Sequence, residues 1–597
     1  MLRTSHLGVV FVTALAACAK KDGSATTDEL VRFVDPDVQP QLPATVSRPD
    51  APPPISGGTL TVSKTSRLAV AADPDRDRVY VVDLSLRSVR FSVELAPKTE
   101  PGRVALDEEG HAFVALRRSG ELATIDLATG AVDVQRACAA PRGVAWDRWR
   151  RQVLVACASG TLMVFPRSGA PTSIAGLGLD LRDVVAREDG FELSYFRSAR
   201  LRKVDVDGTQ SDIPAPTLAG ANVAWRMRDL GNDDGFPVNV VVAQEPSLDL
   251  VSTRPGGYGE TSPAATGIVT SRVWLSQMHC NEADGASCAH SRQLPGAVLP
   301  VDVASNGRQL VVLAAGNSLT PALPQIFVIG VRNLRNPDLM LDSNLTTGRL
   351  PQGQAIAADF SSLDELVVQT REPAQLHIMS DDRLRPLRTI ELAADSRADT
   401  GHEIFHANAG GMIACASCHA EGGDDGHTWS FDTIGPRRTP SLLGTTAHTE
   451  PFHWDGDMKD LSTLVDHVFV ERMTGPKLDA KQVEALGNYL FALPPPPRLR
   501  SVLDVSPRGR ELFEKKCVTC HSGAMMTNNQ SLDVGTGGKF QVPSLIGVAW
   551  RGPWIHNGCA RTLFDRFDPA CGGDHHAELG ALNDADRSFL VEYMESL

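Results

Sequence analysis

The chain has 597 residues, of which 42% are hydrophobic and 22% charged, and its formal net charge is −14 at pH 7. This length exceeds what a single hydrophobic core serves, so the chain is expected to fold as several domains. The acidic balance argues against a nucleic-acid partner, because nucleic-acid phosphates select basic surfaces.

Residues 1–18 are expected to be a signal peptide for export. Arg3 supplies a positive start, an apolar run follows over residues 7–15, and Leu15-Ala-Ala-Cys18 resembles the lipobox of bacterial lipoproteins. The resemblance implies cleavage before Cys18 and a lipid on its sulfur. The lipid would anchor the chain in the bacterial cell envelope, at the outer membrane facing the periplasm or at the cell surface. The alternative is an ordinary secretory signal in which Cys18 is incidental.

A change of pattern near residue 58 separates a tether from a folded domain. Residues 19–57 are rich in Pro, Asp, Ser and Thr, and this composition predicts a disordered tether. Residues 58–395 instead show short apolar strands between turn formers. Within them, Pro101-Gly-Arg-Val-Ala-Leu-Asp107 recurs as Pro141-Arg-Gly-Val-Ala-Trp-Asp147, and more loosely as residues 181–187, at a spacing of about 40 residues.

Each copy of this repeat predicts a propeller blade. Four short strands in about 40 residues are typical of one blade of a β-propeller. Further units begin near Arg67, Asn222, Val301 and Ala355, so we expect about seven blades, with six or eight as the alternatives. The segment is similar to the bacterial YVTN/lactonase-like propellers. After the three clearest copies, strands are expected over residues 112–116, 122–126, 152–156, 162–165, 191–195 and 201–205.

Two pentapeptides, Cys415-Ala-Ser-Cys418-His419 and Cys517-Val-Thr-Cys520-His521, read C-x-x-C-H, the signature of covalent c-type haem attachment. The thiols add to the vinyl groups of the porphyrin, and the histidine ligates the iron on the proximal side. The alternatives are a redox dithiol and half of a zinc site. A dithiol does not need the histidine, and no second zinc pair stands near either motif. The sequence therefore predicts two covalent haems.

Six further cysteines stand outside these motifs and Cys18. In the oxidising compartment that export implies, their spacing favours three local disulfides, although six cysteines allow other connectivities. The expected pairs are Cys138–Cys157, Cys280–Cys288 and Cys559–Cys571.

The region after residue 395 is doubled, which gives one haem subdomain over 396–497 and another over 498–597. Each half is expected to open with a helix, over residues 400–407 and 507–516, and to end with an amphipathic helix, over 479–493 and 583–597. Between these helices, Pro440-Ser-Leu442 matches Pro543-Ser-Leu545. The expected fold is therefore multidomain, an all-β propeller followed by two mainly α-helical cytochrome c-type subdomains.

The order of motifs over residues 402–597 resembles the bacterial di-haem cytochrome c peroxidase family, which includes the MauG-type enzymes. The resemblance implies that His427, in a Gly-His-x-Trp segment, approaches the distal face of the first haem. It implies that Trp454 is an electron bridge between the haems, against the alternative of plain packing. It also implies that Glu471 assists peroxide cleavage and that a calcium ion lies between the haem subdomains.

The sequence offers two candidate distal ligands for the iron of each haem and does not decide between them. The second haem of this family takes a distal methionine late in the domain, but the matching region here, residues 570–576, contains none. Met473 follows His419 by the same number of residues that separates His575 from His521. The first haem is expected to take His427 or Met473, and the second His575 or His576.

Two functions fit this organisation. In the first, an exported peroxidase-like oxidoreductase moves electrons from the second haem to a peroxide-reactive first haem, with a small redox protein as electron donor and hydrogen peroxide as substrate. In the second, both irons keep six ligands, so the chain is a non-catalytic electron-transfer cytochrome with the propeller as a docking module. A di-haem oxygenase of the rubber-cleaving type is a weaker third alternative. An exchangeable sixth site on either iron would separate these functions.

Overall fold

The computed structural model describes residues 38–213, 223–233, 236–259, 267–277, 291–335, 345–380, 383–577 and 579–597. The expected signal peptide with Cys18 and the expected Cys280–Cys288 pair lie outside these residues. Within the part of the chain that is described, no helix is long and apolar enough to cross a membrane.

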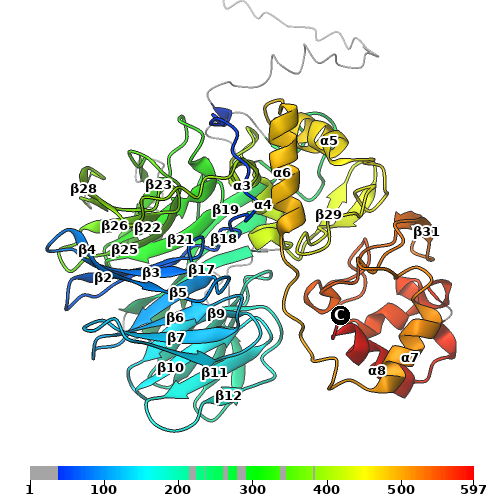
Figure 1. Ribbon diagram of the computed structural model, residues 1–597, viewed down its shortest axis with the longest axis horizontal. Helices are drawn as coiled ribbons and strands as arrows, with labels where there is room; N and C mark the ends of the chain where they lie inside the picture. Colours follow the sequence, from blue (N-terminus) through cyan, green and yellow to red (C-terminus); the bar gives the residue numbers. More distant parts are fainter. Residues whose placement is uncertain are drawn as a thin grey trace, which may run out of the picture. The chain divides into compact units, whose positions relative to one another are not determined.

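Seven four-stranded antiparallel sheets follow one another along the chain, each built from four consecutive strands (Figure 1). The prediction of seven propeller blades is therefore confirmed. The strands form because runs of apolar, mostly β-branched residues alternate with tight turns, and the inner strands are buried on both faces. The predicted strand over residues 201–205 has the observed bounds, and the other five start or end within one residue of them.

The first four blades are made from the N-terminal half of the propeller. Their strands are β1 (Leu60–Val62), β2 (Leu68–Asp73), β3 (Arg78–Asp83) and β4 (Ser88–Glu94); β5 (Pro101–Leu106), β6 (His111–Leu116), β7 (Glu121–Asp126) and β8 (Val132–Arg136); β9 (Pro141–Asp147), β10 (Gln152–Cys157), β11 (Thr161–Pro166) and β12 (Thr172–Ile174); β13 (Leu181–Arg187), β14 (Gly190–Tyr195), β15 (Leu201–Asp205) and β16 (Gln210–Ile213).

The last three blades contain longer strands and two short helical segments, η3 (Ala315–Asn317) and α2 (Val331–Arg335). Their strands are β17 (Val223–Asp233), β18 (Phe236–Pro246), β19 (Val269–Gln277) and β20 (Ser291–Gln293); β21 (Pro300–Ser305), β22 (Gln309–Ala314), β23 (Ile326–Gly330) and β24 (Leu345–Gly348); β25 (Ala355–Phe360), β26 (Leu366–Thr370), β27 (Gln375–Met379) and β28 (Pro386–Glu391).

The ring closes by packing of the first blade against the seventh, without a shared strand. Leu60 and Tyr80 of the first blade join Leu376 and Ile390 of the seventh in one buried cluster. Burial of apolar surface between neighbouring blades therefore stabilises the closure, as it does at the other blade boundaries.

Residues 38–57 correct the predicted tether, because they are packed rather than disordered. Val38 is fully buried, and its carbonyl oxygen accepts a hydrogen bond from Asn408 Nδ2 at 3.0 Å. The carbonyl oxygen of Val46 accepts from the backbone N–H of Thr400 at 2.8 Å. The low hydrophobicity of this segment suggested disorder, but its backbone groups find partners in distant parts of the chain.

The first haem subdomain begins and ends with helices that cross closely. A Cβ atom at Gly401 would lie 2.2 Å from the carbonyl oxygen of Ala485, so the crossing requires glycine. Asp399 caps the first of these helices by accepting from the backbone N–H of His402. The elements are α3 (Thr400–His406), α4 (Cys415–Cys418), η6 (Ala420–Gly422), β29 (Thr428–Phe431), β30 (Gly435–Arg438), α5 (Leu461–Leu464), the π-helix η7 (Val465–Arg472) and α6 (Ala480–Ala492).

The second haem subdomain repeats this plan with a longer first helix and shorter strands. Its first helix has the predicted bounds, with Ser506 as N-cap and Pro507 at the first helical position. The elements are α7 (Pro507–Lys516), β31 (Ser531–Asp533), β32 (Lys539–Gln541), η8 (Val548–Trp550), η9 (Phe564–Phe567), η10 (Pro569–Cys571), η11 (Gly573–His575), η12 (Leu579–Ala581) and α8 (Asp584–Met594).

Candidate haem centres

The four cysteines of the two C-x-x-C-H motifs are free, half-buried thiols. Burial raises the pKa of Cys415 to about 12 and the pKa of Cys517 to about 11. A redox dithiol needs a lowered thiol pKa, so the surroundings of these thiols disfavour that alternative.

Two other cysteine pairs are bonded to each other. Disulfides join Cys138 to Cys157 in the propeller and Cys559 to Cys571 in the second haem subdomain. These pairings are the ones that the sequence spacing favours, and they leave the haem-motif thiols as the free cysteines among the described residues.

His521 and His576 form a nearly parallel ring pair in the second haem subdomain. Their ring centroids lie 6.2 Å apart and their planes meet at 29°. Metal–imidazole bonds of about 2.0 Å, with each ring centre about 1 Å farther out, place two rings on opposite sides of one metal ion roughly 6 Å apart. The pair therefore has the spacing that a single iron between the rings requires.

Each of the two rings has a hydrogen-bond partner at Nδ1. The Nδ1 of His521 lies 3.3 Å from the carbonyl oxygen of Met526, and Arg566 Nε donates to the Nδ1 of His576 at 2.7 Å. The carbonyl oxygen accepts the Nδ1 proton of His521 and leaves its Nε2 for a metal, whereas His576 accepts a proton from Arg566 at Nδ1 and, when neutral, carries its own proton on Nε2. Iron binding by Nε2 of His576 would therefore require the loss of that proton or of the contact with Arg566. Burial lowers the pKa of His521 to about 4 and the pKa of His576 to about 3, so both imidazoles are neutral at pH 7. The neighbouring His575 is exposed, so the structure brings His576 to His521.

The first haem motif has the same support on the proximal side and a different distal side. The Nδ1 of His419 lies 3.4 Å from the carbonyl oxygen of Gly423, and burial lowers the pKa of His419 to about 4. Within the described ranges, His419 has no ring partner comparable to the one that His521 has in His576.

His427 lies in a small buried group after the first motif. Its ring meets Trp429 edge-on at a centroid distance of 4.7 Å. The carboxyl group of Asp425 accepts from the backbone N–H of His427 at 2.9 Å and from Trp429 Nε1 at 3.1 Å. Burial raises the pKa of Asp425 to about 7. This group therefore holds a carboxyl that gains and loses a proton near neutral pH.

Met473 and Glu471 lie close in sequence but in different surroundings. Met473 is 4% exposed and belongs to the buried cluster against which Cys415 and Cys418 pack. Glu471 is in the π-helix η7, its side chain is 39% exposed, and its carboxylate lies 3.0 Å from His467 Nδ1. The structure thus brings Met473 into the core that holds the first haem motif, and it places the carboxylate of Glu471 at the surface.

The two haem subdomains repeat a local fold and contact each other reciprocally. Phe452 bridges to Met458 as Trp554 bridges to Ala560 at the same offset along the chain. The backbone N–H of Arg438 donates to the carbonyl oxygen of His556 at 2.6 Å, and that of Gln541 donates to the carbonyl oxygen of Trp454 at 2.7 Å. These paired contacts relate the two repeats by a local pseudo-two-fold axis.

Trp454 and His556 occupy equivalent positions in the two repeats and meet at this boundary. Their ring centroids lie 6.3 Å apart, and Trp454 Nε1 donates to the carbonyl oxygen of Arg438 at 2.7 Å. On its other side His556 stacks on Phe540 at 3.7 Å. A continuous series of aromatic rings therefore crosses from one haem subdomain to the other.

The calcium ion implied by resemblance stays a prediction. Near this boundary the carboxylate of Asp424 is already paired, with Arg197 Nη1 at 2.9 Å and Arg438 Nη2 at 2.8 Å. In the ranges that the structure covers, one group of three acidic or imidazole side chains lies close enough to share a metal ion, and it is in the propeller.

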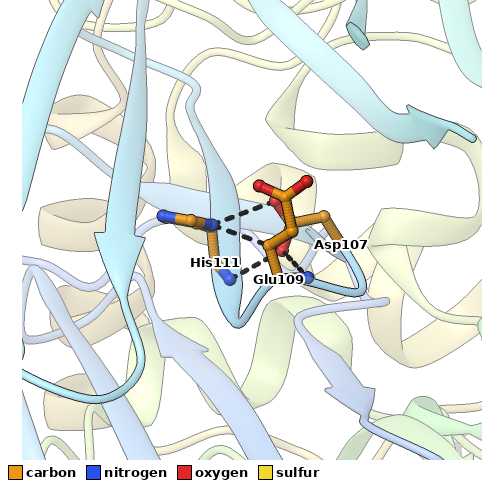
Figure 2. A group of neighbouring side chains, drawn as sticks. All are labelled: Asp107, Glu109 and His111. Atoms are coloured by element: carbon orange, nitrogen blue, oxygen red, sulfur yellow. Dashed lines mark hydrogen bonds and ion pairs between the residues drawn. The ribbon is translucent and has the colours of Figure 1, made fainter. Parts of the chain in front are cut away.

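That propeller group consists of Asp107, Glu109 and His111 (Figure 2). The Nδ1 of His111 lies 3.0 Å from Asp107 Oδ2, and Arg167 Nη2 pairs with that same oxygen at 2.8 Å and with the carboxylate of Glu109. Arg151 also pairs with Glu109, so two guanidiniums offset the two carboxylates, and the group is a network of ion pairs at the end of a hairpin.

Sequence reasoning missed Asp425 and Arg566 and did not place His556 beside Trp454. The last of these had a usable signal, because aligning the two Gly-terminated segments puts His556 opposite Trp454 in the duplicated unit. Asp425 and Arg566 had none, since an isolated Asp or Arg in a polar segment is usually solvated.

Comparison with known proteins adds a family for the C-terminal region. Residues 506–597 match the family described as cytochrome c. Hydrazine synthase subunit gamma of Kuenenia stuttgartiensis is 24% identical over 258 residues, which cover 31% of this chain and 72% of that protein. The chain therefore carries a C-terminal cytochrome c domain, a domain that binds haem covalently.

Two solved structures show similarity to a larger part of the chain. A Kuenenia stuttgartiensis hydrazine synthase chain aligns with a TM-score of 0.44 and 14% identity over 57% of this chain and 99% of that chain. A streptogramin B lyase aligns with a TM-score of 0.37 and 10% identity over 55% of this chain and 93% of that chain.

Proposed function

We propose that this protein is an exported di-haem c-type redox protein that passes electrons between its two haem subdomains. Cys415, Cys418 and His419 would hold the first haem, and the corresponding motif at Cys517, Cys520 and His521 would hold the second. The observation that carries this proposal is the ring pair of His521 and His576, whose 6.2 Å spacing fits one iron. The haems supply the redox chemistry when bound.

We expect the iron of the second haem to have no open coordination position. His521 and His576 would hold the iron of the second haem. The carbonyl oxygen of Met526 orients the ring of His521, and His576 would exchange its contact with Arg566 for the iron. Two neutral imidazoles favour a low reduction potential relative to a histidine–methionine pair. The second centre therefore suits the low-potential end of an electron path.

The path between the centres runs through Trp454 and His556. These rings lie at the reciprocal boundary of the two subdomains, where backbone hydrogen bonds to their carbonyl oxygens fix both segments. Fixed, contacting rings shorten the gap that an electron crosses between the two motifs. The same residues also pack the subdomains together.

The first centre is the place for any catalysis. Met473 is the better-placed candidate for its sixth ligand, because it is buried in the core that holds Cys415 and Cys418. Peroxide reduction at the first centre is the second candidate function, favoured by the buried carboxyl group of Asp425 beside His427. Asp425, rather than the half-exposed Glu471, would then hold the proton.

The sequence supports the proposed export and the proposed redox partner. A lipid on Cys18 would hold the protein at the cell envelope, and a small redox protein would exchange electrons with it. The net charge of −14 favours a basic partner surface, and this attraction weakens as salt concentration rises.

Two neighbouring histidines give a matched test of the second centre. In the haem-loaded protein, His576→Ala should convert one of the two haems from a low-spin to a high-spin absorption and EPR spectrum. His575→Ala removes an exposed imidazole one residue away and should leave both spectra unchanged. Identical spectra for wild type and His576→Ala would overturn the assignment of His576.

Mixing half-reduced, haem-loaded protein with hydrogen peroxide in a stopped-flow instrument separates the two candidate functions. Rapid reoxidation of the wild-type protein would favour peroxide reduction at the first centre. Spectra that do not change would favour electron transfer alone.

A further inference from the structure

A carboxylate next to the first haem motif is buried among arginines of the propeller. Glu421 lies two residues after His419 and is 5% exposed. Its carboxylate accepts from Arg117 Nη2 at 3.0 Å, from Arg182 Nη1 at 2.6 Å and from Arg142 Nη1. These arginines come from the second, fourth and third blades, where Arg117 follows β6, Arg182 is in β13 and Arg142 is in β9. Three blades therefore converge on one side chain of the haem subdomain.

The backbone of Glu421 adopts a conformation that disfavours any residue with a Cβ atom. Its φ and ψ are 53° and 30°, in the left-handed region. The equivalent position in the second haem motif is Gly523, with φ 73°, and no atom lies within 4 Å of where its Cβ would be. The second motif thus uses the residue that suits this backbone. The first motif keeps a glutamate there, which the three guanidiniums hold in place.

The same loop supports the proximal histidine. The backbone N–H of Gly422 donates to the carbonyl oxygen of His419 at 3.0 Å, and the carbonyl oxygen of Gly423 lies 3.4 Å from His419 Nδ1. A hydrogen bond at Nδ1 sets the orientation and the basicity of a metal-bound imidazole. Any force that fixes Glu421 therefore also fixes the partner of His419.

A second carboxylate of this loop is held in the same way. Asp424 accepts from Arg197 Nη1 of the propeller at 2.9 Å and from Arg438 Nη2 at 2.8 Å. The loop after His521, residues 522–526, contains no charged side chain and cannot form such pairs. The two centres thus differ in whether the propeller reaches the loop behind the proximal histidine.

We infer that Glu421 is a positioning residue through which the propeller sets the reduction potential of the first haem and leaves that of the second unaffected. This inference rests on the proposed function, because it requires a haem at Cys415 and Cys418. Removing the carboxylate would leave three guanidiniums without their shared anion and would loosen the hydrogen bond at His419 Nδ1. Both changes favour reduced iron, so the potential of the first haem should rise.

The test compares two variants of the full-length, haem-loaded protein by absorbance-monitored redox titration. Glu421→Gln removes the charge and keeps the side-chain size. Glu421→Gly reproduces Gly523 and relieves the backbone strain, which offsets part of the cost of leaving the arginines without their anion. A Cys517→Ala/Cys520→Ala protein, which lacks the second attachment, assigns the two titration steps. We expect the first-haem midpoint to rise in both Glu421 variants and the second-haem midpoint to stay at its wild-type value.

A matched control breaks a surface ion pair outside this loop. Asp586→Asn removes the partner of Arg508, 2.9 Å away in the second haem subdomain, and should move neither midpoint. An unchanged first-haem midpoint in either Glu421 variant, or equal shifts of both haems, would overturn the inference. Mass analysis of the haem-bearing peptides distinguishes this failure from that of the proposed function, which would show as a Cys415–His419 peptide without haem.

Discussion

A single buried histidine in the last propeller blade makes the acid stability of the protein testable. His377, in β27, is 1% exposed, and its Nδ1 lies 3.1 Å from Thr389 Oγ1. Burial lowers its pKa to about 4, whereas an unfolded histidine titrates near 6.5. Between these values the unfolded chain binds a proton that the folded chain does not. The free energy of unfolding therefore falls as the pH drops from 6.5 to 4, by roughly 3 kcal/mol in total.

Replacing His377 by glutamine should remove this part of the acid sensitivity. We expect the stability of His377→Gln relative to wild type to increase as the pH is lowered from 7 to 4, measured by denaturant unfolding at several pH values. His111→Gln changes a histidine that is 26% exposed on the same propeller and serves as the control. A variant with the same pH dependence as wild type would show that His377 does not carry the effect.

For single residues, the sequence predicts the cysteines that would attach haem better than it predicts the distal ligands of the iron. The C-x-x-C-H motifs identify their own thiols and proximal histidines, because covalent attachment needs all of these residues within one turn of chain. The choice between His575 and His576 depends on how η11 ends and which ring turns inward. Equal spacing from the motifs favoured His575, whereas the structure places the half-buried His576 beside His521. A shift of one residue in a short 3₁₀ segment is invisible to a spacing argument.

At the scale of elements, helix α6 offers a direct test of local stabilisation. Asp479 accepts from the backbone N–H groups of Lys481 and Gln482, and Gln482 returns a hydrogen bond to the N–H of Asp479, which completes a capping box. Asp479→Ala should lower the stability of the first haem subdomain by about 1 kcal/mol. Guanidinium unfolding followed by haem absorbance measures this change.

The control for this cap is its exposed neighbour. Lys481→Ala leaves both cap hydrogen bonds in place, because only the backbone of Lys481 takes part. Equal destabilisation by the two variants would argue that loss of side-chain surface, rather than the cap, causes the effect.

The regular elements were predictable and the irregular ones were not. Strong caps and apolar periodicity placed the helix over residues 507–516 with the observed bounds. The π-helix η7, which buries Val465 and Phe469, was not expected, because a π-helix has no clear sequence signal of its own. Residues 38–57 were expected to be disordered because of their composition. The expectation failed because composition does not reveal the long-range hydrogen bonds that this segment makes with Asn408 and Thr400.

At the scale of the whole molecule, the period of about 40 residues predicted the propeller because each blade mostly contacts its neighbours. The ion pairs of Glu421 with Arg117, Arg142 and Arg182 were not predictable, since Glu421 lies more than 200 positions after each of these arginines. Only the folded chain shows that the propeller reaches the first haem motif.

The most direct measurement of the central claim is the intact mass of the denatured, purified protein expressed with a haem-attachment system. The account predicts a mass that includes two covalently bound haems. It also predicts the loss of one haem in Cys415→Ala/Cys418→Ala and of the other in Cys517→Ala/Cys520→Ala. A wild-type protein that carries one haem, or none that survives denaturation, would contradict it.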